Sequence, residues 1–175
     1  MTHPTFGNDV DIARAAFIHP TAQLYGRITV GEDSSIWPYA VIRSEMHDVV
    51  IGRCTNIQDF AMIHVGYEQG VVIGDYCSIT HRATLHGCRI GDNVLVGIGA
   101  TVMDGCEIGA NSIIAGHAFL REGTIIPPNS IVAGTPAIVK RERDASAENR
   151  RNALLYHRNA IAYAKGDHRA WVDLE

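Results

Sequence analysis

The chain has 175 residues, of which 46% are hydrophobic and 19% charged, and its formal net charge at pH 7 is -4. That length suits one domain with a substantial core. Only 15 lysines and arginines are present, too few to form the basic face that a nucleic acid or an anionic membrane would need. We therefore expect a small-molecule substrate.

Residues 1–17 have no clear period, and we predict an irregular opening segment there. No apolar run near the start is fit for a signal peptide, and no 18 consecutive apolar residues occur anywhere in the chain. We therefore expect a cytoplasmic protein. The cysteines form no C-x-x-C pair, and we expect reduced, buried thiols at Cys54, Cys77, Cys88 and Cys106.

A repeat of six residues dominates positions 18–140. Such a period fits neither an amphipathic helix nor a simple hairpin sheet, but it is typical of a parallel β-helix whose coils stack their aliphatic residues. At roughly three units per coil, the pattern predicts about six to seven coils. The aliphatic positions are Ile18, Leu24, Val30, Ile36 and Ile42; Ile51, Ile57 and Ile63; Ile73, Ile79 and Leu85; and Ile90, Val96, Val102, Ile108, Ile114, Leu120, Ile126, Val132 and Ile138.

Three breaks interrupt the count. The steps from Ile42 to Ile51 and from Ile63 to Ile73 are longer than six, and we interpret His47-Asp48 and Gly66 to Gly70 as loops expelled at corners. The shorter step from Leu85 to Ile90 predicts a tightened corner. Insertions in a solenoid tend to collect on its binding face.

Counting units assigns each aliphatic residue to one of three faces. The first face holds positions 18, 36, 57, 79 and 96, the second 24, 42, 63, 85 and 102, and the third 30, 51, 73, 90 and 108. The residue after each aliphatic should point outward. On the third face this outward column is all glycine, which either lets another element approach or only eases the backbone.

His64 and His86 share the outward column of the second face, one coil apart, so their backbones should lie about 4.8 Å apart. Two imidazoles at that spacing can ligate one metal ion. His81 lies with Asp59 beyond the first face and is rotated away from the pair. Because His81 and His86 are separated by up to roughly 17 Å of extended chain, we expect a second chain to complete the site, with its first face against the neighbour's second face.

A contact of this head-to-tail kind must close into a ring, and the triangular cross-section suggests a homotrimer. Arg43, Gln58 and Asp59 lie beside the histidines in this arrangement. We interpret the other histidines as ordinary surface residues, namely His3, His19, His47, His117, His157 and His168.

Residues 141–175 form a C-terminal helix and tail. Apolar residues at helical spacing predict a helix from Ser146 to Lys165, with Ser146 as the N-cap and Gly166 as the stop. Its apolar positions are Leu154, Leu155, Ile161 and Ala162. We expect this helix to pack along the β-helix.

Several motifs together resemble the γ-class carbonic anhydrase-like family of hexapeptide-repeat proteins. These are R-S-E at 43–45, N-I-Q-D at 56–59, M-I-H at 62–64, T-H-R-A-T-L-H-G-C at 80–88 and A-G-T-P-A at 133–137. The resemblance implies a left-handed parallel β-helix and a homotrimer. It also implies a zinc ion, or iron or cobalt, held by His64 and His86 of one subunit and His81 of the next.

The resemblance further implies roles for four other residues. Gln58 would help place the water at the metal, Arg43 and Asp59 would form ion pairs across the interface, and Glu45 stands where the family more often has aspartate. The family's acidic loop is short here, with Glu68 as its single acid. The family tyrosine after an asparagine is replaced by Ala160, and Tyr156 and Tyr163 are nearby substitutes.

The predicted activity is that of a hydro-lyase. Three imidazoles leave a fourth position on the metal for water, and a metal-bound hydroxide would hydrate carbon dioxide to bicarbonate. The short loop implies slow proton removal and weak turnover. Alternatives are acyl transfer from coenzyme A or a carrier protein, thioester hydrolysis, and a non-catalytic metal-binding trimer.

Overall fold

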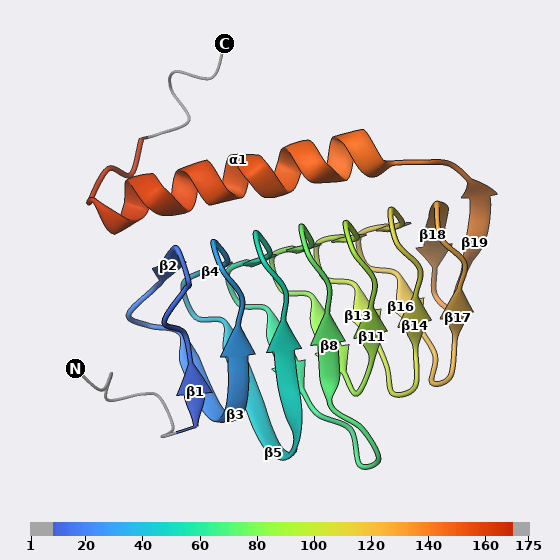
Figure 1. Cartoon of the computed structure of the whole chain (residues 1–175). Helices are drawn as coiled ribbons and strands as arrows, with labels where there is room; N and C mark the ends of the chain where they lie inside the picture. The colour runs from blue at the N-terminus through green and yellow to red at the C-terminus, as the bar shows by residue number, and fades with distance from the viewer. Residues whose placement is uncertain (1–8, 170–175) are drawn as a thin grey trace.

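The computed structural model describes residues 9–169, which form a parallel β-solenoid of about seven turns followed by one helix. Strands of successive coils lie side by side, and the helix runs back across the coils toward the first of them (Figure 1). The predicted class, a left-handed parallel β-helix of hexapeptide repeats with a C-terminal helix, is confirmed.

The strands fall on three faces, and two long strands turn a corner to serve two faces each. The first face contains β2 (Phe17–Ile18), β4 (Ser35–Ile36), β6 (Asn56–Ile57), β9 (Ser78–Ile79), β12 (Leu95–Val96), β15 (Ile113–Ile114), β18 (Ser130–Gly134) and β19 (Ala137–Glu142). The second contains part of β3 (Gln23–Val30) and of β5 (Val41–Ile51), then β7 (Met62–His64), β10 (Thr84–His86), β13 (Thr101–Val102) and β16 (Phe119–Leu120). The third contains β1 (Val10–Asp11), the rest of β3 and β5, β8 (Val71–Ile73), β11 (Arg89–Ile90), β14 (Glu107–Ile108) and β17 (Ile125–Ile126).

The register follows the count of units on every face. Ile57 pairs with Ile79 on the first face, Ile63 with Leu85 on the second, and Ile51 with Ile73 on the third. The three face assignments are confirmed, because a constant step of six returns the chain to the same face after each coil.

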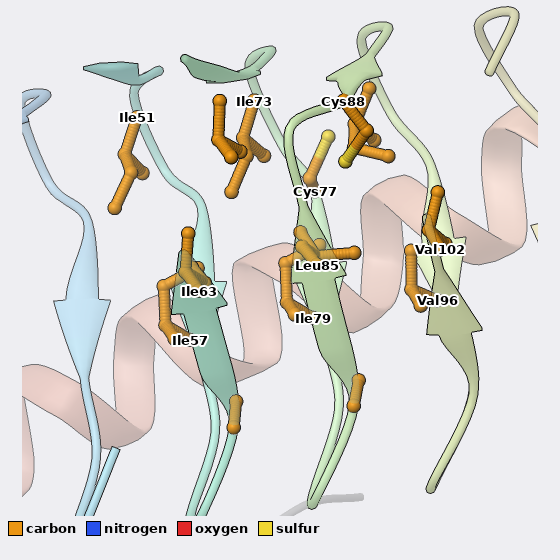
Figure 2. Packing of buried hydrophobic residues seen from close by; sticks show 14 of the residues in the cluster. Ile51, Ile57, Ile63, Ile73, Cys77, Ile79, Leu85, Cys88, Val96 and Val102 are labelled. Carbon is orange, nitrogen blue, oxygen red and sulfur yellow. The ribbon is translucent and has the colours of Figure 1, made fainter. Parts of the chain in front are cut away.

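The core is a set of aliphatic columns that run through successive coils (Figure 2). Ile57, Ile63, Ile79 and Leu85 are all fully buried, as is Cys77. Burial raises the pKa of Cys77 to about 12, so this thiol stays protonated at neutral pH. All four cysteines are free and buried, as predicted.

Ile79→Ala should destabilise the protein by about 2–5 kcal/mol, because Ile79 is fully buried between Ile57 and Val96 and its removal leaves a cavity inside the solenoid. Chemical denaturation at a fixed protein concentration measures this loss. Ile125→Ala is the matched control, since Ile125 is 62% exposed and its loss should change the free energy of unfolding by about 0.5 kcal/mol or less. Equal losses in the two variants would contradict the assignment of the core.

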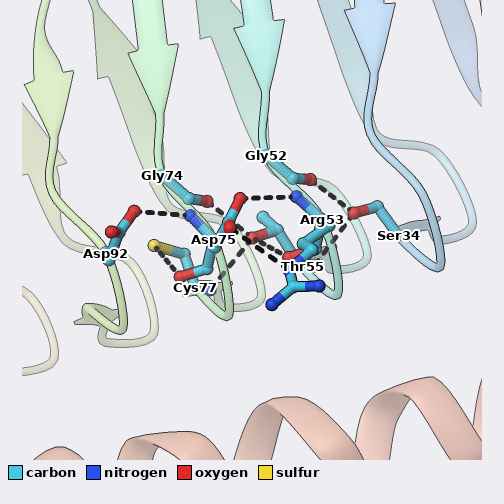
Figure 3. Close-up of polar contacts among 8 residues, drawn as sticks. All are labelled: Ser34, Gly52, Arg53, Thr55, Gly74, Asp75, Cys77 and Asp92. Atoms are coloured by element: carbon cyan, nitrogen blue, oxygen red, sulfur yellow. Dashed lines mark hydrogen bonds and ion pairs between the residues drawn. The ribbon is translucent and has the colours of Figure 1, made fainter.

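The glycine column of the third face is explained by close approach of the next coil. A Cβ on Gly52 or Gly74 would lie 2.5 or 2.3 Å from a carboxylate oxygen and 2.6 or 2.7 Å from the backbone of the following coil. The same corner carries a polar ladder (Figure 3), in which the Thr55 hydroxyl donates to the Gly74 carbonyl and the Arg53 backbone N–H donates to Asp75. The column therefore serves stacking of the coils and leaves no room for side-chain chemistry.

The first break is a bulge within one strand. β5 runs from Val41 to Ile51 and pairs with β7 before the corner and with β8 after it. Its register against β3 steps from Ser44 to Val49 while β3 advances only from Gly26 to Ile28, so the residues around His47-Asp48 are expelled at the corner, as predicted. Gly66–Gly70 does form a loop between β7 and β8, closed by a hydrogen bond from the Gly66 N–H to the Gln69 carbonyl. The corner after Leu85 is tight, as predicted, and Gly87 takes a φ of +47° there.

The opening segment is more regular than predicted. Residues 1–8 lie outside the described part of the chain, but Val10–Asp11 pairs with Ile28 and Thr29, and Phe17 already belongs to the first coil. At the other end β19 pairs antiparallel to β18. These two strands cover the ends of sheets that would otherwise expose unpaired backbone groups.

The helix α1 (Ser146–Ala164) starts and packs differently from the prediction. Ser146 is its first helical residue and not its N-cap; the N-cap is Ala145, and the Asp144 carboxylate accepts from the Ser146 N–H. The predicted apolar stripe is largely solvent-facing, since Leu154 and Ile161 are 44% and 39% exposed. The residues that the helix buries are small or carry amides, namely Asn149, Ala153, Asn159 and Ala160.

The helix covers the first face, where it contacts β2, β4, β6 and β9. Tyr156 and Tyr163 pack edge-on against Trp37, with ring centroids 5.5 and 4.9 Å away. The Asn149 side chain donates to the carbonyls of Asn93 and Ser112. Among residues 9–169, no helix is long and apolar enough to cross a membrane.

Candidate metal centre

His64 and His86 form the centre of the candidate site. They are register partners on adjacent strands of the second face, β7 and β10, as the six-residue step predicts. Their ring centroids are 4.9 Å apart, and His64 Nδ1 lies 3.0 Å from His86 Nε2. Parallel in-register pairing therefore brings two imidazole nitrogens face to face on the surface of one chain.

A carboxylate holds the outer nitrogen of each ring. His64 Nε2 donates to Glu45, 3.1 Å away, and His86 Nδ1 donates to Asp104, 2.8 Å away. His81 has the same kind of partner, because its Nδ1 lies 3.0 Å from Asp59. Each ring is thus oriented by an acid and keeps its other nitrogen for a ligand.

This donor set fits a metal ion. When both outer nitrogens donate to carboxylates, the facing nitrogens of His64 and His86 are left to share either one proton, at a distance of 3.0 Å, or a metal ion. Two nitrogens bound to tetrahedral zinc are about 3.3 Å apart, close to the spacing of this pair. Histidine ligands in metal sites also characteristically donate their second N–H to a carboxylate.

His81 lies elsewhere, on the corner between the first and second faces. Among residues 9–169, it does not join His64 and His86 in any group of three donors whose ligand atoms lie within 4.8 Å of one another. Its side chain is 42% exposed and that of Asp59 is 33% exposed. Part of the predicted docking geometry is wrong, because α1 covers the first face and leaves this corner as the surface that a neighbour can meet.

Arg43 and Glu45 stand at the edge of the site. They form an ion pair within the chain, and Arg43 is the register partner of His64 on β5. Although burial acts to raise it, the pKa of Glu45 is lowered by its own backbone hydrogen bond, by His64 and by the Arg43 charge. Glu45 therefore accepts from His64 as a carboxylate.

Gln58 does not reach the exposed surface. It was expected to point outward, but it is only 2% exposed beneath α1, where its amide donates to Asn56 at 2.8 Å. Trp37, in the same column, is also buried. A repeat pattern shows which side chains leave the solenoid, but not that a helix from elsewhere in the chain covers them.

Two acids near His86 were missed by sequence reasoning. A cavity of about 660 Å³ beside it is lined by Glu68 from the predicted loop and also by Asp104 and Glu122 from later coils. Gly66 and Gly87 leave the space that the Asp104 carboxylate fills, since a Cβ there would lie 2.0 and 2.3 Å from it. The column position of Asp104, one coil beyond Gly87, is the signal that could have found it.

Of the two tyrosines considered as substitutes at position 160, Tyr156 lies nearer the candidate ligands. Burial raises its pKa to about 12, and the charge of Asp59, the partner of His81, adds to the shift. Tyr163 packs against Phe17 and Trp37 instead. Ala160 belongs to α1 and is fully buried, so a tyrosine side chain at that position would not fit between the helix and the solenoid.

Comparison with known proteins finds hexapeptide-repeat proteins under more than one name, including carbonic anhydrases and a "putative acetyltransferase" from Bacillus cereus that is 30% identical, with a TM-score of 0.76 and a match over 97% of this chain and 92% of that one. A family model described as "Bacterial transferase hexapeptide (six repeats)" matches residues 87–122. A Methanocaldococcus jannaschii protein named as a probable carbonic anhydrase is 45% identical over 91 residues, covering 52% of this chain and 57% of that protein. Gamma carbonic anhydrase 1, mitochondrial, of Arabidopsis thaliana is 38% identical over 112 residues, 58% of this chain and 41% of that protein.

A crystal structure of a hexapeptide transferase family protein from Anaplasma phagocytophilum extends the likeness to nearly the whole chain. It is 33% identical, has a TM-score of 0.77, and the match covers 90% of this chain and 91% of that one. The chain spans about half the length of the curated relatives it matches. With this fold and these relatives, the chain belongs to the family of hexapeptide-repeat proteins, and over about half of its length it is similar to proteins named as gamma carbonic anhydrases.

Proposed function

We propose that this protein is a metal-dependent hydro-lyase that hydrates carbon dioxide to bicarbonate at sites between the subunits of a homotrimer. The observation that carries the proposal is the pairing of each ligand histidine with its own carboxylate, Glu45 for His64, Asp104 for His86 and Asp59 for His81. Carboxylate partners fix the ring orientation and make the imidazoles better ligands.

In this proposal His64 and His86 of one subunit and His81 of its neighbour hold zinc, iron or cobalt. A zinc ion would supply Lewis-acid activation of water and lower the pKa of that water to about 7. Asp59 and Asp104 keep the rings of His81 and His86 turned with one nitrogen free. Arg43 and Glu45 hold His64 in the same way from the neighbouring coil. Gln58, buried with its amide on Asn56, would have to leave that hydrogen bond to reach a substrate.

The proton released by hydration needs an acceptor. Glu68 and Glu122 line the cavity beside His86 and are the two acids placed to receive it there. Both side chains are exposed, so they act as relays and not as ligands in this proposal. A single short loop therefore does not limit the protein to one internal base.

The test of the proposal is metal content followed by stopped-flow carbon dioxide hydration, under anaerobic and aerobic conditions. We expect about one zinc or iron ion per chain that is absent from the His64→Ala/His86→Ala protein, and a rate that rises with added imidazole, because external buffer supplements the few internal acceptors. Metal below about a tenth of one ion per chain after reconstitution would overturn the site. If the protein carries its full metal content but shows no hydration at high buffer concentration, the metal site stands and the proposed reaction is overturned.

The positioning role of Asp104 gives a more local prediction. Asp104→Asn removes the charge but keeps an acceptor oxygen, so metal affinity should fall by about 10–100-fold. Asp104→Glu should recover part of that loss. Asp92→Asn is the matched control, since Asp92 accepts from the Asp75 N–H on another corner, and its metal affinity should be unchanged. Equal affinity of both asparagine variants would show that Asp104 does not orient His86.

Acyl transfer is the second candidate, because the Anaplasma phagocytophilum structure bears the name of the hexapeptide transferase family. A hexapeptide acyltransferase needs one histidine as a base, which leaves the facing pair without a purpose. The same purified protein also serves to test thioester hydrolysis and a purely structural role of the metal. Coenzyme A thioester turnover that survives removal of the metal would favour acyl transfer.

A further inference from the structure

A second set of metal-type donors lies on the opposite edge of the helix-covered face. Asp33 and Cys54 occupy equivalent places at the corner between the third and first faces, in successive coils, and His157 reaches them from α1. One ligand atom of each residue lies within 4.8 Å of the other two. The candidate metal centre is on the second face, so this cluster is separate from it.

Asp33 and Cys54 belong to a column of equivalent residues from successive coils that runs along this corner. Its residues all have a positive φ, and in the later coils they are asparagines, which tolerate this conformation. Asn93 and Asn111 are joined by a side-chain hydrogen bond, and Asn93 also donates to the Ser146 carbonyl at the start of α1. Toward the other end of the column this asparagine ladder is replaced by Asp33, Cys54 and Tyr76.

One of the three donors is held in place by the solenoid, and the other two are free to adjust to an ion. Cys54 is 8% exposed and comes from the solenoid, whereas Asp33 and His157 are more exposed side chains that can adjust. His157 Nδ1 lies 3.1 Å from the Asp33 carbonyl, so when Nδ1 donates there, Nε2 has a free lone pair. Donating the second ring N–H to a backbone carbonyl is the usual arrangement of a metal-ligating histidine.

The surrounding charges are compatible with a divalent cation. Burial raises the pKa of the Cys54 thiol, the Asp33 carboxylate adds to the shift, and a hydrogen bond with Tyr76 opposes it. Arg150 lies over the Tyr76 ring at 3.4 Å, and Arg53 pairs with Asp75 at 3.3 Å, so both cations have their own partners. Metal binding would release the Cys54 thiol proton to solvent, and the resulting thiolate, a carboxylate and a neutral imidazole would together balance a 2+ ion.

We propose that Asp33, Cys54 and His157 bind a zinc-type divalent cation that fastens α1 to the first coils of the solenoid. Thiolate, imidazole and carboxylate are the ligands that zinc takes in proteins, with a fourth position left for water. Bound ligand atoms in such a site are about 3.3–3.6 Å apart, so the cluster needs a contraction of about 1 Å. Because the ion would link residues 124 positions apart in the chain, it would stabilise the docked helix.

Cobalt(II) titration of the full chain tests this site, since a thiolate ligand produces a charge-transfer band in the near ultraviolet that an all-histidine site lacks. The titration uses the His64→Ala/His86→Ala protein, so that the candidate metal centre does not compete and failure of the proposed function does not affect the result. We expect a band that saturates at about one cobalt per chain and is displaced by zinc. Zinc should also raise the melting temperature of this protein by several degrees.

In that background, Cys54→Ser should abolish the band, and His157→Ala should weaken cobalt binding by at least about tenfold. Cys106→Ser is the matched control, because Cys106 is also buried but lies away from this corner, and it should leave the band unchanged. If Cys54→Ser does not fold, His157→Ala decides, since His157 is only partly buried. Absence of the band at saturating cobalt, or a band unchanged in His157→Ala, would overturn the proposal.

Discussion

Replacing His86 by alanine should empty the candidate metal centre and lower carbon dioxide hydration by about a thousandfold or more, since the activation of water depends on the ion. His86 supplies the nitrogen that faces His64 at 3.0 Å, and no neighbouring side chain offers another imidazole in its place on this strand. Removing it leaves two of the three proposed ligands, His64 and the neighbour's His81, and two histidines hold zinc weakly. Both losses are measured in protein that also carries His157→Ala, so that the proposed site at Asp33, Cys54 and His157 adds no metal. Metal analysis of the purified variant and the hydration rate measured at high buffer report the two losses.

His117→Ala is the control for that experiment. His117 lies on a solenoid corner and is exposed, so its removal should change neither metal content nor rate. The folding of both variants is compared by circular dichroism and by the trimer mass. A His86→Ala protein that keeps full metal would show that this histidine is not a ligand, whatever its hydration rate.

Mixing two inactive variants should restore metal binding. His64→Ala and His81→Ala proteins should each lose metal, but they lack ligands from different sides of the proposed interface. An interface regains all three ligands when one neighbour supplies His64 and His86 and the other supplies His81. In a ring that holds both variants, one interface of three is intact, and the reciprocal interface lacks two ligands.

The expected recovery has a ceiling. Random assembly of equal amounts restores about a quarter of the wild-type metal, and rings made only of mixed composition restore at most about a third. Co-refolding at several ratios, followed by metal analysis of the isolated trimers, measures the recovery. Mixed trimers as empty as their parents would place all three ligands in one chain and contradict the interface assignment.

The repeat determined most of the fold before the structure was known. Because each coil buries its aliphatic residues only by stacking on the coil before it, a step of six sets both the register and the face of every strand. That is why His64 and His86 could be placed side by side from their positions alone. The same logic located the extra residues within 42–51 but not their form, since β5 continues as one strand around the corner and expels them as a bulge.

The remaining features depend on contacts that have no period in the sequence. The docking of α1 buries Trp37 and Gln58, brings Tyr156 near Asp59 and carries His157 to Cys54, and a helix that packs with small residues and amides gives only a weak apolar stripe. Asp104 reaches His86 from a later coil because Gly66 and Gly87 leave space for its carboxylate, and Glu122 lines the same cavity. The sequence by itself determined which residues share a coil and a face, because backbone stacking is periodic; tertiary structure decided which of them are covered, paired or open to a ligand, because those contacts join residues as far apart in the chain as Phe17 and Tyr163.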